Sequence, residues 1–397
     1  MIPNFVQQIK KRALSPNPPT SSGRSGKWEK INFDDLVFVP AQLAKRSVDY
    51  FREKISSETV VGKKSKKPVK LRTPVIIGAM SFGALSDAAK ISLAKASKIV
   101  GTFANTGEGG MLQEERKEAE FLIAQFSTGR FGVDEKYLKS ADAIEVKIGQ
   151  GAKPGQGGLL PAEKVTAKIA EVRGVGKGLD VHSPPYHKDI KNINDLKAKI
   201  FWLRKLTGGK PIILKLGAGD IETDIKLAVK ADPDIISIDG IAGGTGAAPE
   251  VMLEEVGIPT LAALARARKT LDKLKVKQEL WIGGGLNTGG DIAKALALGA
   301  DAVFMGTSMM IAMGCVYCRQ CFKGNCPLGI ATQDEKLVQK LDIEQAAQSI
   351  ANFISSITEE VKMVAGACGY DSIHKLSPKD LRALDPVIAQ IAGVKMA

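Results

Sequence analysis

Short apolar runs recur along the chain from residue 74 onward, and each run ends in glycine or a polar residue. Eight such runs occupy residues 75–78, 100–105, 121–125, 143–148, 212–216, 235–239, 279–283 and 302–306. Runs of this length, apolar throughout, are typical of strands that are buried on both faces of a parallel sheet.

The segments between most of these runs have helical spacing. Pro161 occupies a first helical position and is followed by apolar residues on one face, and Asp220 opens a second segment of the same kind. Two further helices are predicted at 261–274 and 292–298. Strands that alternate with helices predict a parallel (β/α)8 TIM barrel. A doubly wound open sheet is the alternative, but no clean Gly-x-Gly-x-x-Gly follows the first strand.

The two flanks differ from this pattern. Residues 1–72 are rich in Pro, Ser, Lys and Gly and lack periodicity, which predicts an irregular arm that wraps the barrel, with a helical or turn piece near 41–54. We assign 73–340 to the barrel, including a cysteine loop at 315–326. In 341–397, apolar spacing after Asp342 predicts a long amphipathic helix, and Ser377-Pro378 predicts a last short helix packed on the barrel.

Charge is concentrated in the arm. The chain of 397 residues has a formal net charge of +13, and its first 72 residues hold sixteen Lys and Arg against six Asp and Glu. The arm lacks interleaved aromatic residues, so we expect no nucleic-acid binding and interpret it as a solvated face or a docking surface for an acidic partner such as a ferredoxin. Neither a secretory signal nor an apolar run of membrane-spanning length is visible, so we expect a cytoplasmic protein without membrane contact.

Small and polar residues follow the predicted strands, and in a parallel barrel all strand ends meet at one rim, where active sites lie. This rim carries Ala79, Met80, Ser81, Thr106, Glu108, Lys147, Gln150, Lys215, Gly243, Gly244, Thr245, Gly284, Gly285, Gly306 and Thr307.

Two glycine-rich ends, 283–285 and 306–307, close the last two strands. Glycine lets backbone N–H groups approach an anionic oxygen, so we expect a phosphate there rather than only tight packing. Lys147 and Lys215 end strands four and five; a fixed cation there can stabilise the anionic reduced form of a flavin, or it is a solvated lysine.

Other rim residues have the chemistry to bind a substrate. Glu108 can bind an amine, accept a proton or solvate a loop. Gln150, Lys153 and Arg173 offer amide and cationic groups to carboxylates, although Arg173 is equally a helix-end charge. The stretch 182–187 holds two histidines and two prolines, and we interpret it as a rigid loop that covers a ligand rather than as a metal pair.

Four cysteines form a compact array that Pro327 follows: Cys315, Cys318, Cys321 and Cys326. Clustered cysteines without an export signal favour metal binding over disulfides. This spacing is a style of iron–sulfur ligation. Zinc is the alternative, but a second separated pair is absent. Cys368 stands alone and is interpreted as a small buried hydrophobe.

Seven motifs in order now identify a family resemblance: 79–86 (AMSFGALS), 105–110 (NTGEGG), 150–155 (QGAKPG), 183–185 (SPP), 243–247 (GGTGA), 284–286 (GGL) and 310–315 (MIAMGC). The chain resembles the FMN-binding synthase domain of glutamate synthase over about residues 70–370. The resemblance implies an FMN barrel with an iron–sulfur cluster. It also implies reductive amination of 2-oxoglutarate to glutamate through 2-iminoglutarate, with electrons passing from the cluster to FMN and a hydride then going to the iminium carbon.

By position, the resemblance implies roles for individual residues. Cys315, Cys321 and Cys326 match the three ligands of a [3Fe-4S] cluster, and Cys318 is an addition that would allow [4Fe-4S]. The FMN region matches Ala79, Met80, Ser81, Thr106, Lys215, Gly284, Gly285, Gly306 and Thr307, and the 243–245 turn and Lys147 are placed with it. The 2-oxoglutarate region matches Glu108, Lys147, Gln150 and Arg173.

The chain also departs from the family. Gly283 stands where the family has Asp before Gly-Gly. We expect neither an amidotransferase domain before the barrel nor a glycine-repeat domain after it. The resemblance therefore implies an oligomer that takes ammonia, free or from a glutaminase subunit, and electrons from ferredoxin or an NAD(P)H-oxidising subunit. Three alternatives remain: an N-methylglutamate synthase subunit that uses methylamine, a non-catalytic flavin and iron–sulfur electron-transfer subunit, and a flavin-dependent isomerase.

Overall fold

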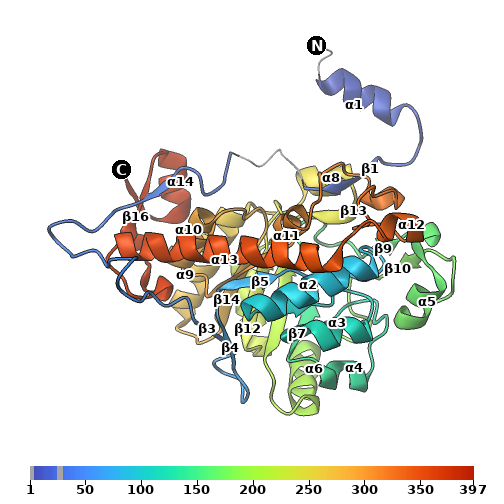
Figure 1. Ribbon diagram of the computed structural model, residues 1–397, viewed down its shortest axis with the longest axis horizontal. Coiled ribbons are helices and arrows are strands. Elements are labelled where there is room, and N and C mark those ends of the chain that lie inside the picture. The colour runs from blue at the N-terminus through green and yellow to red at the C-terminus, as the bar shows by residue number, and fades with distance from the viewer. Residues whose placement is uncertain (1–3, 25–29) are drawn as a thin grey trace.

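The computed structural model describes residues 4–24 and 30–397. Its centre is an eight-stranded parallel sheet with the order β5-β15-β14-β12-β11-β8-β7-β6 (Figure 1). The strands are β5 (Val75–Ile77), β6 (Phe103–Asn105), β7 (Phe121–Phe126), β8 (Ala143–Lys147), β11 (Ile212–Gly217), β12 (Ile235–Asp239), β14 (Glu279–Gly283) and β15 (Ala302–Met305). Because β5 and β6, at the two ends of this order, contact each other, the sheet curls into a barrel. The predicted (β/α)8 fold is confirmed, and the open sheet is excluded.

The parallel register brings the strand ends to one level. Lys147 lies opposite Lys215, and Asp239 lies opposite both Gly217 and Gly283. The second strand was predicted to begin at residue 100, which is wrong. Val100 is the last residue of α2 (Asp87–Val100), and Gly101 ends that helix in the left-handed conformation, so the strand starts only after the turn.

Helices surround the barrel, and side-chain caps fix where several of them begin. The outer layer includes α3 (Gln113–Glu118), α4 (Glu135–Ser140), α6 (Ile193–Leu206), α7 (Ile221–Ala231), α9 (Thr260–Leu274) and α10 (Gly289–Ala297). The helix predicted to begin at Pro161 begins later. A 3-10 turn, η1 (Ala162–Lys164), comes first, and α5 (Ala167–Arg173) starts where the Thr166 hydroxyl accepts a hydrogen bond from the Ile169 N–H.

The long C-terminal helix is confirmed as α13 (Ile343–Ala367), capped by Asp342 and packed along α2 and α10 (Figure 1). The helix predicted at Ser377-Pro378 is only a 3-10 turn, η4 (Pro378–Asp380). There the Asp380 carboxylate accepts hydrogen bonds from both the Ser377 N–H and hydroxyl, and the chain then continues as strand β16 (Leu381–Ala383). The last helix is α14 (Pro386–Ala392).

Apolar side chains fill the barrel at the end opposite the rim. Trp281 and Phe103 are fully buried there together with Val61 and Leu71, which come from the arm hairpin β3 (Thr59–Val61) and β4 (Val69–Leu71). The hairpin therefore closes the bottom of the barrel, and the opening lies at the rim.

The arm contacts the barrel domain at several separate places. It contains a helix that was not predicted, α1 (Asn4–Arg12), and strand β2 (Leu36–Phe38), which pairs with β16; β17 (Lys395–Met396) lies on the other side of β16. Residues 41–54 form bends and turns. Part of the basic charge is paired within the chain, because Lys63 contacts Asp301 and Lys64 contacts Asp232. Across 4–24 and 30–397, none of the helices has the length and apolar character needed to cross a membrane.

Candidate active site

A cavity opens at the rim, where the sequence analysis places the candidate site residues. Its wall is built from the segments that follow most of the barrel strands, together with the cysteine loop and residues 23–24 of the arm. The predicted residues that line it are Ala79, Met80, Ser81, Glu108, Lys147, Gln150, Lys153, Lys215, Gly243, Gly244, Thr245, Gly284, Gly285, Gly306, Thr307, Cys315, Cys318, Cys321 and Cys326.

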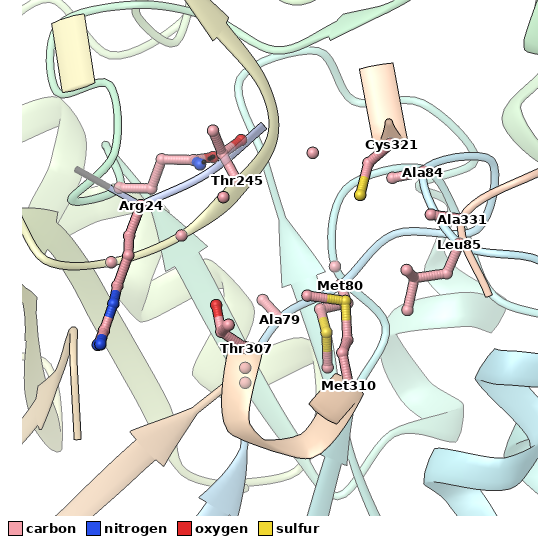
Figure 2. A pocket seen from close by; sticks show the side chains of 18 of the residues that line it. Arg24, Ala79, Met80, Ala84, Leu85, Thr245, Thr307, Met310, Cys321 and Ala331 are labelled. Atoms are coloured by element: carbon pink, nitrogen blue, oxygen red, sulfur yellow. Dashed lines mark hydrogen bonds between the residues drawn. The ribbon is translucent and has the colours of Figure 1, made fainter. Parts of the chain in front are cut away.

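Glycines form a cradle on one side of the cavity. Gly284 and Gly285 have φ values of +110° and +77°, which side chains rarely adopt. A Cβ added to Gly244 would lie 2.5 Å from the Thr307 Oγ1, so only glycine leaves that space open. Figure 2 shows Thr307 on the cavity wall close to Ala79. Backbone N–H groups exposed by such glycines suit an anionic ligand.

Lys215 supplies a buried positive charge beside this cradle. Its side chain is 8% exposed, and its Nζ lies 3.7 Å from the Asp239 Oδ2. Burial lowers the pKa of Lys215, but the carboxylates of Glu145 and Asp239 outweigh burial, and the pKa is raised above its ordinary value. Lys215 is therefore an ammonium at neutral pH.

Glu108 and Lys147 form a second charged pair. The Lys147 Nζ lies 3.2 Å from the Glu108 Oε2, and both side chains are largely buried. Burial raises the pKa of Glu108, but the charge of Lys147 and hydrogen bonds from Ser183 and Lys147 lower it further, so the pKa lies below its ordinary value. Glu108 is therefore a carboxylate at neutral pH.

Lys153 extends this group of charges. Its side chain is almost fully buried, and its Nζ donates a 2.8 Å hydrogen bond to the Ala247 carbonyl. Burial and then the charge of Lys147 lower the pKa of Lys153 to about 8. Gln150 donates to the Thr245 Oγ1 at 3.5 Å. Cations, an amide and one carboxylate thus share a single wall.

Two predicted residues lie behind the wall instead of lining it. Thr106 is fully buried, and its Oγ1 contacts the Tyr137 hydroxyl at 2.8 Å. Arg173 donates a 2.7 Å hydrogen bond to the Phe82 carbonyl, and burial lowers the pKa of Arg173 to about 10. A Cβ on Gly109 would lie 2.6 Å from the Arg173 Cζ, so this side chain packs under the loop that carries Glu108.

The two histidines of the 182–187 loop lie in different environments. His182 is exposed, whereas His187 is buried and its Nε2 donates a 2.8 Å hydrogen bond to the Lys147 carbonyl. Burial and then the charge of Arg130 lower the pKa of His187 to about 4, so the ring is neutral. His187 therefore supports the end of β8. The same loop also touches the 158 turn, since the Gly158 N–H donates to the Ser183 Oγ at 2.7 Å.

The cysteine loop forms another part of the wall. Cys326 is buried, Cys315 and Cys321 are half-buried, Cys318 is exposed, and all four are free thiols. Burial raises the pKa of Cys315 and of Cys321, and neighbouring cysteines raise both further. Within the described ranges, no three His, Cys, Asp or Glu side chains are grouped so that they could hold a metal ion as they stand.

Several cavity residues were missed by sequence reasoning, among them Lys164 and Arg24. The Lys164 side chain is buried, and its Nζ donates to the Ala84 and Cys321 carbonyls at 3.0 and 3.2 Å. This lysine therefore ties together the two rim segments that carry Ala84 and Cys321, which are both labelled in Figure 2. Burial lowers the pKa of Lys164 to about 8. No local motif marks either Lys164 or Arg24, since their partners lie far away in the sequence.

The barrel, the rim cavity and its glycine cradle define a (β/α)8-barrel enzyme whose active site faces the carboxyl ends of the strands. Solved structures share this fold. A mutant of the active chimera of (S)-mandelate dehydrogenase is 17% identical, with a TM-score of 0.61 and 95% of both chains covered. A mandelate oxidase mutant with a monooxide FMN adduct is 17% identical, with a TM-score of 0.56, 89% of this chain and 91% of that one covered.

Sequence comparison identifies the family. The family model described as "Conserved region in glutamate synthase" matches residues 27–371. A glutamate synthase large subunit-like protein of Rhizobium meliloti (strain 1021) is 40% identical over 94% of this chain and 89% of its own length. The archaeal glutamate synthase [NADPH] of Methanocaldococcus jannaschii is 41% identical over 94% and 80%. The chain belongs to the glutamate synthase family and is an oxidoreductase of that class.

Proposed function

We propose that this chain is the synthase subunit of a split glutamate synthase that holds FMN and an iron–sulfur cluster and reductively aminates 2-oxoglutarate to L-glutamate. The observation that carries the proposal is that a glycine cradle, Lys215 and the Glu108–Lys147 pair all line one cavity. Cradle and charges together suit a flavin phosphate, a reduced flavin ring and a dicarboxylate substrate.

The cradle residues fit FMN. The space that a Cβ on Gly244 would fill, and the left-handed conformations of Gly284 and Gly285, leave backbone donors open to a phosphate. Lys215 offers a permanent cation for the ring. When bound, the flavin supplies a hydride to the substrate carbon, and Lys215 stabilises the negative charge of its reduced form.

The group formed by Glu108, Lys147, Lys153 and Gln150 suits the substrate and the amine. Lys147, Lys153 and Gln150 offer donors to the two carboxylates of 2-oxoglutarate. The Glu108 carboxylate holds ammonia as ammonium and takes the proton that this nucleophile must lose before it attacks the keto carbon. Loss of water would then give 2-iminoglutarate; Glu108 would return its proton to the imine nitrogen, and the resulting iminium carbon would be the position that takes the hydride to form glutamate. Arg173 holds the Glu108 loop from behind.

The cysteine loop fits a cluster in its donor chemistry. Three thiols, those of Cys315, Cys321 and Cys326, lie in the cavity wall and are at least half-buried, whereas Cys318 is exposed. We therefore propose a [3Fe-4S] cluster rather than [4Fe-4S]. When bound, such a cluster supplies single electrons.

The proposal extends to partners. The glutamate synthase of Methanocaldococcus jannaschii carries NADPH in its name. We propose an oligomeric, cytoplasmic protein that receives electrons from an NAD(P)H-oxidising subunit or a ferredoxin and ammonia from a glutaminase subunit.

Anaerobic flavin reoxidation tests the proposal. The FMN-loaded protein is reduced and then mixed with 2-oxoglutarate and either ammonia or methylamine. Reoxidation with ammonia is expected, and Glu108→Gln slows it while the surface control Glu135→Gln does not. Faster reoxidation with methylamine would indicate an N-methylglutamate synthase, and none with either amine would leave an electron-transfer subunit.

A further inference from the structure

One segment of the N-terminal arm belongs to the rim cavity. Strand β1 (Thr20–Gly23) pairs antiparallel with β13 (Thr245–Pro249), which directly follows the 243–244 glycines of the cradle (Figure 1). Gly23 and Arg24 then continue into the cavity wall. We call residues 20–24 the strap.

Ser22 fixes the strap to the cysteine loop. Its side chain is fully buried; its hydroxyl donates a 2.7 Å hydrogen bond to the Gly246 carbonyl and accepts one of 3.0 Å from the Phe322 N–H. One hydroxyl thus joins the arm, the β13 segment and the cysteine loop, which are far apart in the sequence.

Tyr317 holds the next two residues. The Arg24 N–H donates to the Tyr317 hydroxyl at 3.1 Å, and a Cβ on Gly23 would lie 2.9 Å from that oxygen. Gly23 also has a φ of +89°, so this close approach requires glycine. Tyr317 itself has a φ of +55°, an uncommon conformation for a residue of its size. The strap is therefore built into the wall and not merely laid over it.

These contacts deliver the Arg24 side chain to the cradle. Its Nη1 lies 3.4 Å from the Gly285 carbonyl, and the side chain is half-buried. In Figure 2 the Arg24 side chain runs down the left of the view and ends at about the level of Thr307. Among residues 4–24 and 30–397, no carboxylate forms an ion pair with Arg24, so its charge is not neutralised by that part of the chain.

We infer that Arg24 binds the phosphate of FMN. The inference rests on the proposed function, because it assumes that FMN occupies the cradle. Backbone N–H groups of the cradle carry only partial charges, whereas the phosphate is an anion, and a guanidinium matches phosphate oxygens with two parallel donors. The arm is thus part of the cofactor site, and one of its basic residues has a specific use there.

Riboflavin lacks the phosphate of FMN. Comparing the two flavins therefore distinguishes a contact to the phosphate from a general effect on flavin binding. FMN and riboflavin are titrated into flavin-free protein, with quenching of flavin fluorescence as the readout, for the unaltered chain, Arg24→Ala, Arg24→Lys and the control Arg12→Ala. Arg12 ends α1 and carries the same charge on an exposed surface of the arm. Melting temperatures report whether each variant is folded.

We expect Arg24→Ala to weaken FMN binding by about 10- to 100-fold, as for a hydrogen-bonded charge, and to leave riboflavin binding unchanged. Arg24→Lys recovers part of the loss, and Arg12→Ala loses nothing. Equal weakening of both flavins, or unchanged FMN binding, would overturn the role of Arg24. An unaltered chain that binds neither flavin would instead overturn the proposed function.

Discussion

Lys90 connects two rim loops from beneath, and its removal should make the chain unfold more easily. It lies in α2 with only 1% of its side chain exposed, and its Nζ is 2.8 Å from the Glu115 Oε1, which is equally buried. The same ammonium donates to the carbonyls of Met80, Asn105 and Thr106 at 2.6, 2.8 and 3.1 Å. These carbonyls belong to the segment after β5 and to the end of β6 with the residue that follows it, and both regions lead into cavity residues.

We predict that Lys90→Met lowers the free energy of unfolding by about 3–5 kcal/mol, because a buried carboxylate and three carbonyls lose their partner. Lys95 provides a matched control on the same helix. Its ion pair with Glu344 lies at the surface, where water screens the charges, so Lys95→Met should leave the urea midpoint nearly unchanged.

Urea denaturation followed by circular dichroism measures both variants. The double variant Lys90→Met/Glu115→Leu should recover part of the loss, since it removes the orphaned carboxylate. Flavin affinity of Lys90→Met should fall as well, because Met80 lines the cavity. If Lys90→Met and Lys95→Met had the same urea midpoint, the reasoning about buried charge would be refuted.

Three further predictions concern protonation and the cysteines. Burial and then Asp301 raise the pKa of Glu279 from 4.5 to about 7. Between these two pKa values the folded chain holds a proton that the unfolded chain releases. The free energy of unfolding therefore falls as the pH rises from 4.5 to 7. Glu279→Gln should therefore raise the free energy of unfolding by about 3 kcal/mol at pH 8 and by much less at pH 5, and equal gains would refute this. The pKa of Lys153 is about 8, so this side chain loses its positive charge above pH 8. The KM for 2-oxoglutarate should therefore rise above pH 8 by about tenfold per pH unit, and it should stay flat in Lys153→Arg. A flat profile in the unaltered chain would contradict a substrate role for Lys153. Iron and sulfide analysis should show that Cys326→Ser loses its iron while Cys318→Ser keeps it, because Cys326 is buried in the wall and Cys318 is exposed; equal loss would mean four ligands.

The barrel was predictable because its strands carry their own signal. Each is an apolar run that stops at glycine or a polar residue, and parallel pairing places all these stops on one rim. Competing local interactions explain the two helix predictions that were wrong, those at Pro161 and at Ser377-Pro378. Pro161 suits a first helical position, but the Thr166 hydroxyl caps the helix later. At Ser377, the predicted cap does form, but it closes a single turn that the pairing of β16 with β2 ends.

The cavity was only partly predictable for a different reason. Residues such as Glu108 and Lys147 stand at strand ends, so their place follows from the fold. Arg24 reaches Gly285 from 261 positions away, and Lys164 reaches Cys321 from 157. Such contacts depend on tertiary packing of the arm and loops, which leaves no periodic trace in the sequence. The same limit applies to Arg173, whose chemistry was visible but whose position behind the wall was not.

The most direct test of the proposed reaction is the amount of product in a single turnover. Flavin-loaded protein with a known content of reduced flavin is mixed anaerobically with excess 2-oxoglutarate and ammonium, and L-glutamate is quantified by chromatography. We predict one L-glutamate for each flavin reoxidised, and none when ammonium is omitted. Flavin that reoxidises without formation of glutamate would contradict the proposed reaction.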